Sequence, residues 1–190
     1  MSDQLSATHQ VRPTRSGRWV PAGQAVAVVA LFAASGLGAG WLWFRIWDAP
    51  PGVVSDHTWY PDPYMPGQAA EFDAVAIYVL VALAAGVLGG VVCAFLLARA
   101  EVVTLAAVAV GSALAAWLMA LVGSALGPAD PDVLAKTAED GTKLSGDLVL
   151  TGVSPYVALP LGALGAVLVV FLATPGHRPA EPRLAPPPPG

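Results

Sequence analysis

Charged residues are absent from four long stretches of this 190-residue chain. These stretches cover residues 19–44, 74–98, 102–129 and 148–177. Each is longer than the roughly 20 residues that carry a helix across about 30 Å of hydrocarbon. A soluble core helix needs apolar residues on one stripe only, whereas the second stretch is apolar all round. The sequence therefore predicts four transmembrane helices, with spans of about 22–46, 74–98, 102–126 and 154–173.

The segments outside these stretches differ in charge, and the difference predicts their side of the membrane. Residues 1–18, the connection 99–101 and residues 175–190 together hold six arginines and three acidic residues. The connections 45–73 and 130–147 hold three basic and ten acidic residues. Because Lys and Arg are in excess on the cytoplasmic side, we expect a multi-pass plasma-membrane protein with both chain ends in the cytoplasm. The first stretch is too long for a signal-peptide core, so a signal anchor is the better interpretation.

The predicted domains follow from this topology. Residues 1–18 lack periodicity and residues 175–190 are rich in proline, so both are expected to be disordered cytoplasmic tails. Residues 19–174 form the transmembrane domain. Its second and third spans are separated by only a few residues, which predicts an antiparallel helical hairpin.

The two outer loops, 48–73 and 127–150, look too structured for free linkers. The first is rich in proline and aromatic residues, and the second offers a short helix near 133–138. Turn signals within 140–150 indicate a small β-hairpin, against which Trp59 and its neighbours are expected to pack. The predicted fold class is an all-α membrane protein, a four-transmembrane-helix bundle with a small extracytoplasmic cap that contains a β-hairpin.

The spans contain no ionisable residue at mid-membrane depth, which disfavours a proton-coupled transporter. Small residues recur at a spacing of four, which lets helix backbones approach closely. The pairs are Gly36 and Gly40, Gly86 and Gly90, Gly111 and Ala115, and Gly162 and Ala166. We expect contacts within one bundle, and self-association into a homo-oligomer is the alternative.

Aromatic residues gather at the outer end of the first span, where Trp41, Trp43, Phe44 and Trp47 follow one another closely. Such residues anchor helices at the level of the lipid headgroups. An interfacial belt is therefore predicted, and an aromatic ligand-binding box is the alternative.

Two sets of outer-loop residues have side chains of the kind that bind metals. They are Asp56, His57 and Asp62, and Asp130, Asp132, Glu139 and Asp140. Neither set has a diagnostic spacing, and the chain lacks HExxH, CxxC, EF-hand, Walker and GxSxG motifs. Solvated acidic loops are the better interpretation, so we expect no enzyme activity, no cofactor and no metal. A pI near 5.1 disfavours nucleic-acid binding, and a single cysteine excludes an intrachain disulfide.

The chain has no asparagine and seven arginines against two lysines, a composition typical of GC-rich genomes. The stretch Gly111-Ser-Ala-Leu-Ala-Ala-Trp-Leu-Met119, with Gly127-Pro-Ala-Asp-Pro131 and the region from Asp140-Gly-Thr142 to Ser154-Pro-Tyr156, carries a resemblance. It resembles a group of uncharacterised actinobacterial four-helix transmembrane proteins with no assigned activity. The resemblance implies a topology and an envelope location, and it implies no catalytic residue.

The leading hypothesis is a non-enzymatic accessory component of the bacterial cell envelope that binds a protein partner through its outer loops. The bilayer itself is the other expected partner. The candidate partner-binding residues are Asp56, His57, Trp59, Tyr60 and Tyr64. A small transporter or channel subunit formed by oligomerisation is the alternative, and an enzyme acting on lipid-linked substrates comes third.

Overall fold

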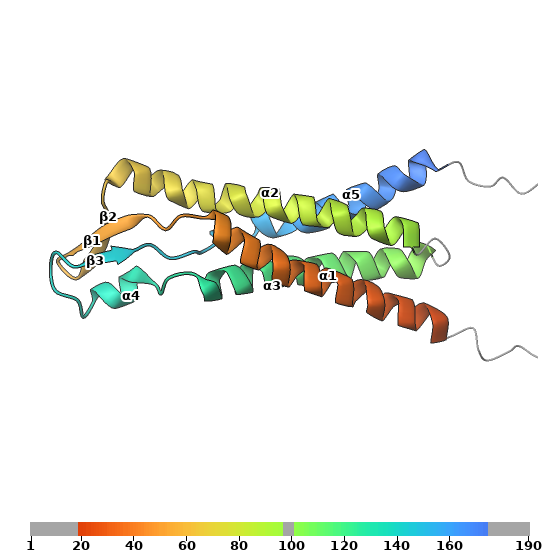
Figure 1. Cartoon of the computed structure of the whole chain (residues 1–190), viewed down its shortest axis with the longest axis horizontal. Coiled ribbons are helices and arrows are strands. Elements are labelled where there is room, and N and C mark those ends of the chain that lie inside the picture. The colour runs from red at the N-terminus through yellow and green to blue at the C-terminus, as the bar shows by residue number, and fades with distance from the viewer. Residues whose placement is uncertain (1–18, 97–100, 175–190) are drawn as a thin grey trace, which may run out of the picture.

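The computed structural model describes residues 19–96 and 101–174. It is mostly helical, with four long helices packed together and a small three-stranded antiparallel sheet at one end (Figure 1). The elements in chain order are α1 Trp19–Ile46, β1 Pro51–Ser55, β2 Thr58–Pro61, α2 Tyr64–Leu96, α3 Glu101–Leu126, α4 Pro131–Ala135, β3 Lys143–Ser145, the 3₁₀ helix η2 Ser154–Val157 and α5 Ala158–Ala173. The two predicted tails and the connection between α2 and α3, residues 97–100, lie outside the described residues.

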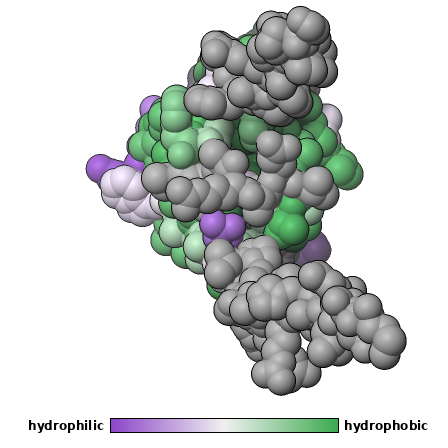
Figure 2. Space-filling view, turned by 90° about the vertical axis from the view of Figure 1, so that its right-hand side faces the viewer, coloured by the Kyte–Doolittle hydropathy of each residue, from purple (hydrophilic) through white to green (hydrophobic). Residues whose placement is uncertain are grey.

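Four segments are long and apolar enough to cross a membrane, as predicted. They are Ala22–Ile46, Phe72–Phe95, Val103–Ala135 and Ser154–Ala173, the third of which continues past α3 into α4. Large apolar side chains such as Leu88 (68% exposed) and Phe95 (71% exposed) face outward from the bundle. Figure 2, which views the molecule from the end opposite the sheet, shows a mostly hydrophobic described surface. The chain is an integral membrane protein with four spans.

The two ends of the helical bundle differ. One end carries a cap, which contains the sheet and α4 and is defined here as residues 47–63 and 127–153. The start of α1 and the end of α5 lie together at the opposite end, which we call the tail end (Figure 1). Both ends of the described chain therefore lie on the same side, as an even number of spans requires.

Two helix pairs form the main contacts of the bundle, α1 with α3 and α2 with α5. A Cβ atom added to Gly36 on α1 would lie 2.5 Å from the Ala115 carbonyl oxygen on α3. A Cβ atom on Gly90 of α2 would lie 2.3 Å from the Ala163 carbonyl oxygen on α5. The predicted small-residue contacts are thus made within one chain, because only glycine allows backbones to approach this closely.

The helices α2 and α3 run antiparallel, but each packs mainly on another helix. The predicted helical hairpin is therefore not a close-packed pair. The glycine face of α2, with Gly86 and Gly90, lies against α5, where Leu159 and Ala163 present their backbones. The fit between these two backbone surfaces makes α5 the packing partner of α2. The short connection between α2 and α3 determines only that the two helices run in opposite directions.

An aromatic group near the cap connects three helices. The Trp43 indole Nε1 donates a hydrogen bond to the Ala74 carbonyl oxygen at 2.8 Å, and the Tyr78 hydroxyl donates to the Ala116 carbonyl oxygen at 2.8 Å. The rings of Trp43 and Tyr78 meet edge to face, with centroids 5.1 Å apart. Both hydroxyl and indole N–H are thereby satisfied inside the bundle, which is how buried aromatic residues of this kind are usually accommodated.

This packing corrects the prediction of an interfacial belt at the end of α1. Trp41 is 55% exposed and fits that role, but Trp43 is fully buried and Trp47 is only 7% exposed. Trp43 and Trp47 are four residues apart, so they share one face of the helix. That face is turned toward the bundle, a direction that composition alone does not reveal.

The sheet of the cap has the strand order β2-β1-β3, with both neighbours of β1 antiparallel to it. The cap contains a hairpin as predicted, but residues 51–61 form it and the predicted segment 140–150 contributes only β3. The hairpin turns at Asp56 and His57, both with positive φ. Residue types other than Asn and Gly give a weak signal for such a turn, which is why the pattern was missed.

Side-chain and backbone contacts join the two connections into one unit. The Trp59 indole Nε1 on β2 donates to the Leu144 carbonyl oxygen on β3 at 3.3 Å, so it reaches across β1. The Trp59 ring covers Gly52, where a Cβ atom would lie 2.3 Å from the indole nitrogen. Trp59 thus packs with the segment that contains β3, as expected from the sequence.

Candidate functional site: an acidic cleft

The five predicted partner-binding residues are spread over the cap. Asp56 and His57 form the exposed tip of the hairpin, and Tyr60 is exposed on β2. Tyr64 is the first residue of α2, at the other end of β2 from the tip, and is 59% exposed. Trp59 is half-buried and contributes to the packing of the cap itself. The structure therefore places the exposed members at two ends of a strand and forms no single cluster from them.

The acidic residues of the cap do not assemble a metal-binding geometry in the described part of the chain. No three His, Cys, Asp or Glu side chains among the described residues lie close enough together to hold an ion. Neither set considered from the sequence, around His57 or around Asp130, therefore brings three such side chains together in the described structure.

A polar cleft of about 260 Å³ lies between the cap and the bundle. Residues from α2 and from both long connections meet there, although they are far apart in the sequence. The lining residues are Trp47, Pro50, Ala70, Ala74, Asp130, Asp132, Asp147, Val149 and Thr151. This cleft was not predicted from the sequence, because Asp147 falls in the segment 140–150 that was predicted as a β-hairpin and Trp47 was predicted to lie in the headgroup region.

Local structure fixes two of the acids. The Asp130 carboxylate caps α4, where its Oδ1 accepts hydrogen bonds from the backbone N–H groups of Asp132 at 2.8 Å and Val133 at 3.3 Å. Such capping is the usual role of an aspartate just before a helix. It also orients the second carboxylate, because Asp132 lies in the first turn of α4.

The third acid, Asp147, is held by its neighbours on both sides. The Gly146 N–H donates to the Pro50 carbonyl oxygen at 2.8 Å, and Leu148 is buried with 1% exposure. Leu148 sits against Gly127, where a Cβ atom would lie 2.9 Å from the Leu148 Cβ. Asp147 is thereby fixed at the cleft between two anchored residues.

The electrostatic environment of the cleft is unfavourable to its own charges. Partial burial, followed by repulsion from Asp130 and Asp132, raises the pKa of Asp147. Within the described residues, none of the three carboxylates forms an ion pair. The cleft thus concentrates negative charge without a cation to balance it.

Trp47, whose side chain also lines the cleft, carries a buried hydrogen-bond donor. Its side chain is 7% exposed, and its indole Nε1 has no hydrogen-bond partner in the described part of the chain. Buried polar groups are nearly always paired, so a donor of this kind needs an explanation. Among the other indole groups of the chain, Trp43 and Trp59 both donate to backbone carbonyls.

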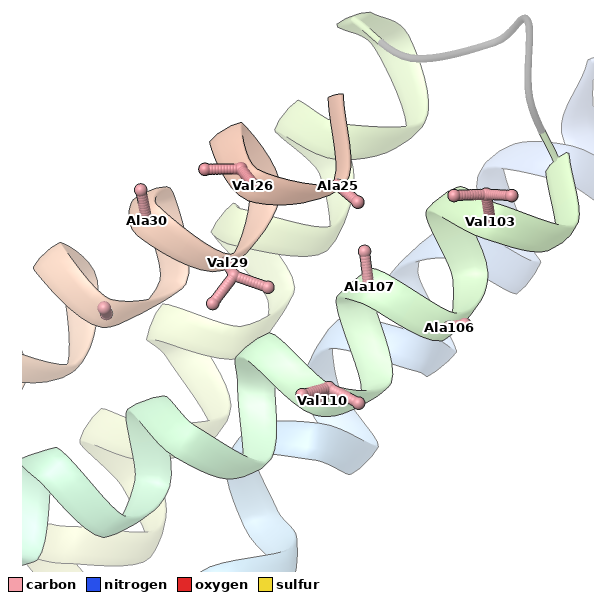
Figure 3. Close-up of a pocket in the computed structure, with 9 residues that line it drawn as sticks. Ala25, Val26, Val29, Ala30, Val103, Ala106, Ala107 and Val110 are labelled. Carbon is pink, nitrogen blue, oxygen red and sulfur yellow. The ribbon is translucent and has the colours of Figure 1, made fainter. Parts of the chain in front are cut away.

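A second hollow, of about 700 Å³, lies between α1 and α3 near the tail end (Figure 3). The two helices are packed closely at Gly36 and Gly40 and are further apart in this region. The lining residues are all alanine or valine, among them Ala25, Val29 and Val110. It lies within the spans, where such a groove faces acyl chains, and it offers no polar group for chemistry.

The fold and the cleft define the class of protein, a four-span integral membrane protein whose two long connections form one cap. No protein-family model, no curated protein and no solved structure matches the chain. The resemblance to actinobacterial four-helix membrane proteins stays a prediction. Function must therefore be argued from the cap and its cleft.

Proposed function

We propose that this protein is a non-enzymatic accessory component of the bacterial plasma membrane that binds a protein partner through its acidic cap. The observation that carries the proposal is the cleft, where Asp130, Asp132 and Asp147 form no ion pair with any residue that the structure describes. The cap, residues 47–63 and 127–153, holds eight acidic residues and two lysines. A surface of one sign favours partners of the opposite sign and steers their approach.

The proposed orientation places the cap outside the membrane and both chain ends in the cytoplasm. It rests on the arginine excess in residues 1–18 and 175–190 and on the acidic connections at the other end. The described structure supports a common side for the two ends, because α1 starts and α5 ends at the tail end.

The composition and packing of the membrane-spanning helices support a purely structural role for them. Three polar groups buried within the described spans are bonded to backbone carbonyls. The Ser112 hydroxyl donates to the Ala109 carbonyl oxygen of its own helix at 3.1 Å, and the Tyr78 hydroxyl and Trp43 indole N–H donate to carbonyl oxygens of neighbouring helices. Glycine residues also bring the backbones of α1 and α3, and of α2 and α5, into close contact. A single chain therefore offers no polar route for a solute through its described interior.

The alternative is a small transporter or channel formed between several copies. Such a path needs polar residues on surfaces between copies, whereas the groove between α1 and α3 is lined by alanine and valine. A flux assay with the purified protein in liposomes tests this alternative, and solute flux that depends on the protein would support it against the partner-binding proposal.

Photocrosslinking tests the partner-binding proposal directly. A photoreactive amino acid is placed at Tyr60 on the cap (50% exposed), at Tyr64 where α2 leaves the cap (59% exposed), and at Leu88 on the lipid-facing part of α2 (68% exposed). We expect the same captured protein from Tyr60 and Tyr64 and not from Leu88. Capture of lipids alone, or of the same proteins from Leu88, would contradict the proposal.

A further inference from the structure

We infer that the hollow between α1 and α3 near the tail end holds one acyl chain of an anionic phospholipid, whose headgroup is bound by the arginines that precede α1 in the sequence. The hollow lies at the end of the bundle opposite the cap, so the inference goes beyond the proposed function and does not depend on it. The depth of the hollow, the side chains that line it and the charge next to it all support this ligand.

The hollow is about as deep as one leaflet of a bilayer. Its lining on α1 runs from Ala25 to Ala33, a distance of about 12 Å along a helix. The span Ala22–Ile46 has its middle residue at Ala34, so the lining stays within one half of the span. Half of the roughly 30 Å of hydrocarbon is about 15 Å, which is the depth that one acyl chain occupies.

The floor of the hollow lies where α1 and α3 come into contact. A Cβ atom on Gly111 would lie 3.3 Å from the Phe32 side chain, and one on Gly36 would lie 2.5 Å from the Ala115 carbonyl oxygen. The two helices are thus closely packed on the cap side of Phe32. A transmembrane helix of a partner or of a second copy crosses both leaflets and needs a groove along the whole span. An acyl chain needs only the open half.

The lining leaves room for a flexible apolar chain. All nine lining residues are alanine or valine, and Figure 3 shows Ala25 and Ala107 facing each other across the hollow. Larger side chains such as Leu88 and Phe95 face outward from the spans elsewhere. The volume of about 700 Å³ lies within the range of about 300–1,000 Å³ found for ligand sites. Because the lining residues have no polar side chains, the hollow suits the acyl chain of a lipid and not its headgroup.

Positive charge lies in the sequence directly before α1. Arg12, Arg15 and Arg18 precede Trp19, where α1 begins. Trp19 is three residues before the apolar span, which is about 4.5 Å along the helix and within a headgroup layer of roughly 5–8 Å. Basic residues next to a span attract anionic lipids, and each contributes about fivefold to binding. A headgroup at this level is joined directly to a chain that enters the hollow at Ala25.

Photolabelling of the unmodified full chain in nanodiscs tests the position of the acyl chain. Phosphatidylglycerol with a diazirine on one acyl chain is irradiated, and mass spectrometry locates the adducts. We expect enrichment in residues 25–33 and 103–110 over other lipid-facing segments, such as those around Leu88 and Leu168. As the diazirine is moved from the headgroup toward the chain end, the adducts should move from Ala25 toward Ala33. An even distribution over the spans, or adducts that do not move along the hollow, would overturn the inference.

Ala25→Phe tests whether the hollow itself receives the chain, because the added ring occupies the space across from Ala107. Ala27→Phe is the matched control, since Ala27 is exposed on the same helix and does not line the hollow. We expect Ala25→Phe to lose the adduct enrichment in residues 103–110 and Ala27→Phe to keep it. Equal enrichment in the two variants would contradict the inference. If Ala25→Phe does not fold, the movement of the adducts in the unmodified chain decides the question.

Native mass spectrometry of the full chain in detergent tests the headgroup, with phosphatidylglycerol and phosphatidylcholine of the same acyl chains as probes. We expect the first phosphatidylglycerol to bind at least about fivefold more tightly. Arg15→Gln combined with Arg18→Gln should remove this preference. Arg178→Gln combined with Arg183→Gln removes as many charges from the other tail and should keep it. Equal binding of the two lipids, or equal effects of the two double variants, would overturn the assignment of an anionic headgroup. None of these measurements involves the cap, so this inference and the proposed function fail separately.

Discussion

The close contact between α2 and α5 predicts a large effect of a very small substitution, Gly90→Ala. The added Cβ atom would lie 2.3 Å from the Ala163 carbonyl oxygen, whereas ordinary van der Waals contact begins near 3.4 Å. The two backbones must therefore separate by about 1 Å, because no flexible side chain stands between them. Overpacking of this kind typically costs about 1–3 kcal/mol.

Gly165→Ala on α5 is the matched control, since a Cβ atom there would meet nothing within 4 Å. Both substitutions replace a helical glycine by alanine, so the gain in helix propensity of about 1 kcal/mol cancels between them. Unfolding of the purified chain in mixed micelles, followed by circular dichroism as denaturing detergent is added, gives the two free energies. Gly90→Ala should be the less stable by about 1–3 kcal/mol. Equal unfolding midpoints would refute the α2–α5 contact.

Two further predictions concern the core and the cleft. Tyr78→Phe removes the hydrogen bond to the Ala116 carbonyl oxygen and should lower the free energy of unfolding by about 1 kcal/mol, whereas Tyr156→Phe should change it little in the same assay. Because the raised pKa of Asp147 means that the folded state binds its proton more tightly, its charge costs stability at neutral pH. Asp147→Asn should therefore raise the thermal midpoint at pH 7 relative to Asp140→Asn, and this advantage should disappear as the pH falls through the raised pKa. An advantage that grows toward low pH would contradict the assignment.

The helices were predictable because their signal is long and redundant. More than 20 consecutive uncharged residues leave few alternatives to a membrane span, whatever the contacts of any one side chain. The neighbours within the bundle were harder to predict. Gly86 and Gly90 predicted a close contact, but nothing in their spacing indicates that α5, and not the sequence neighbour α3, supplies the other surface.

The cap was predictable in kind and less so in detail. Prolines near 50–51 and 61–63 were taken as loop signals, although Pro51 and Pro61 lie at the ends of β1 and β2, where the loss of an N–H is tolerated. The helix α2 also begins at Tyr64, ten residues before the predicted span, so part of the predicted loop 48–73 is helical. Residues 64–73 extend α2 beyond its apolar stretch, and because they are not uniformly apolar, hydropathy does not predict that they are helical.

The cleft could not be predicted from local patterns. Its acids come from the two ends of one connection, and Trp47 is the first residue of the other connection, directly after α1. Each of these residues has an ordinary local interpretation, and only the three-dimensional fold brings them together. The three carboxylates without an ion pair and the Trp47 indole N–H without an acceptor can be recognised only in the folded structure of the described residues.

The proposed function requires the cap to lie outside the cell, and cysteine labelling measures on which side of the membrane it lies. In a Cys93→Ala background, Thr58→Cys places a thiol on the exposed hairpin and Thr174→Cys places one at the tail end. A membrane-impermeant maleimide is applied to intact cells and then to permeabilised cells. We expect Thr58→Cys to be labelled in intact cells and Thr174→Cys only after permeabilisation. Labelling of Thr174→Cys alone in intact cells would place the acidic cap in the cytoplasm and contradict the proposed function.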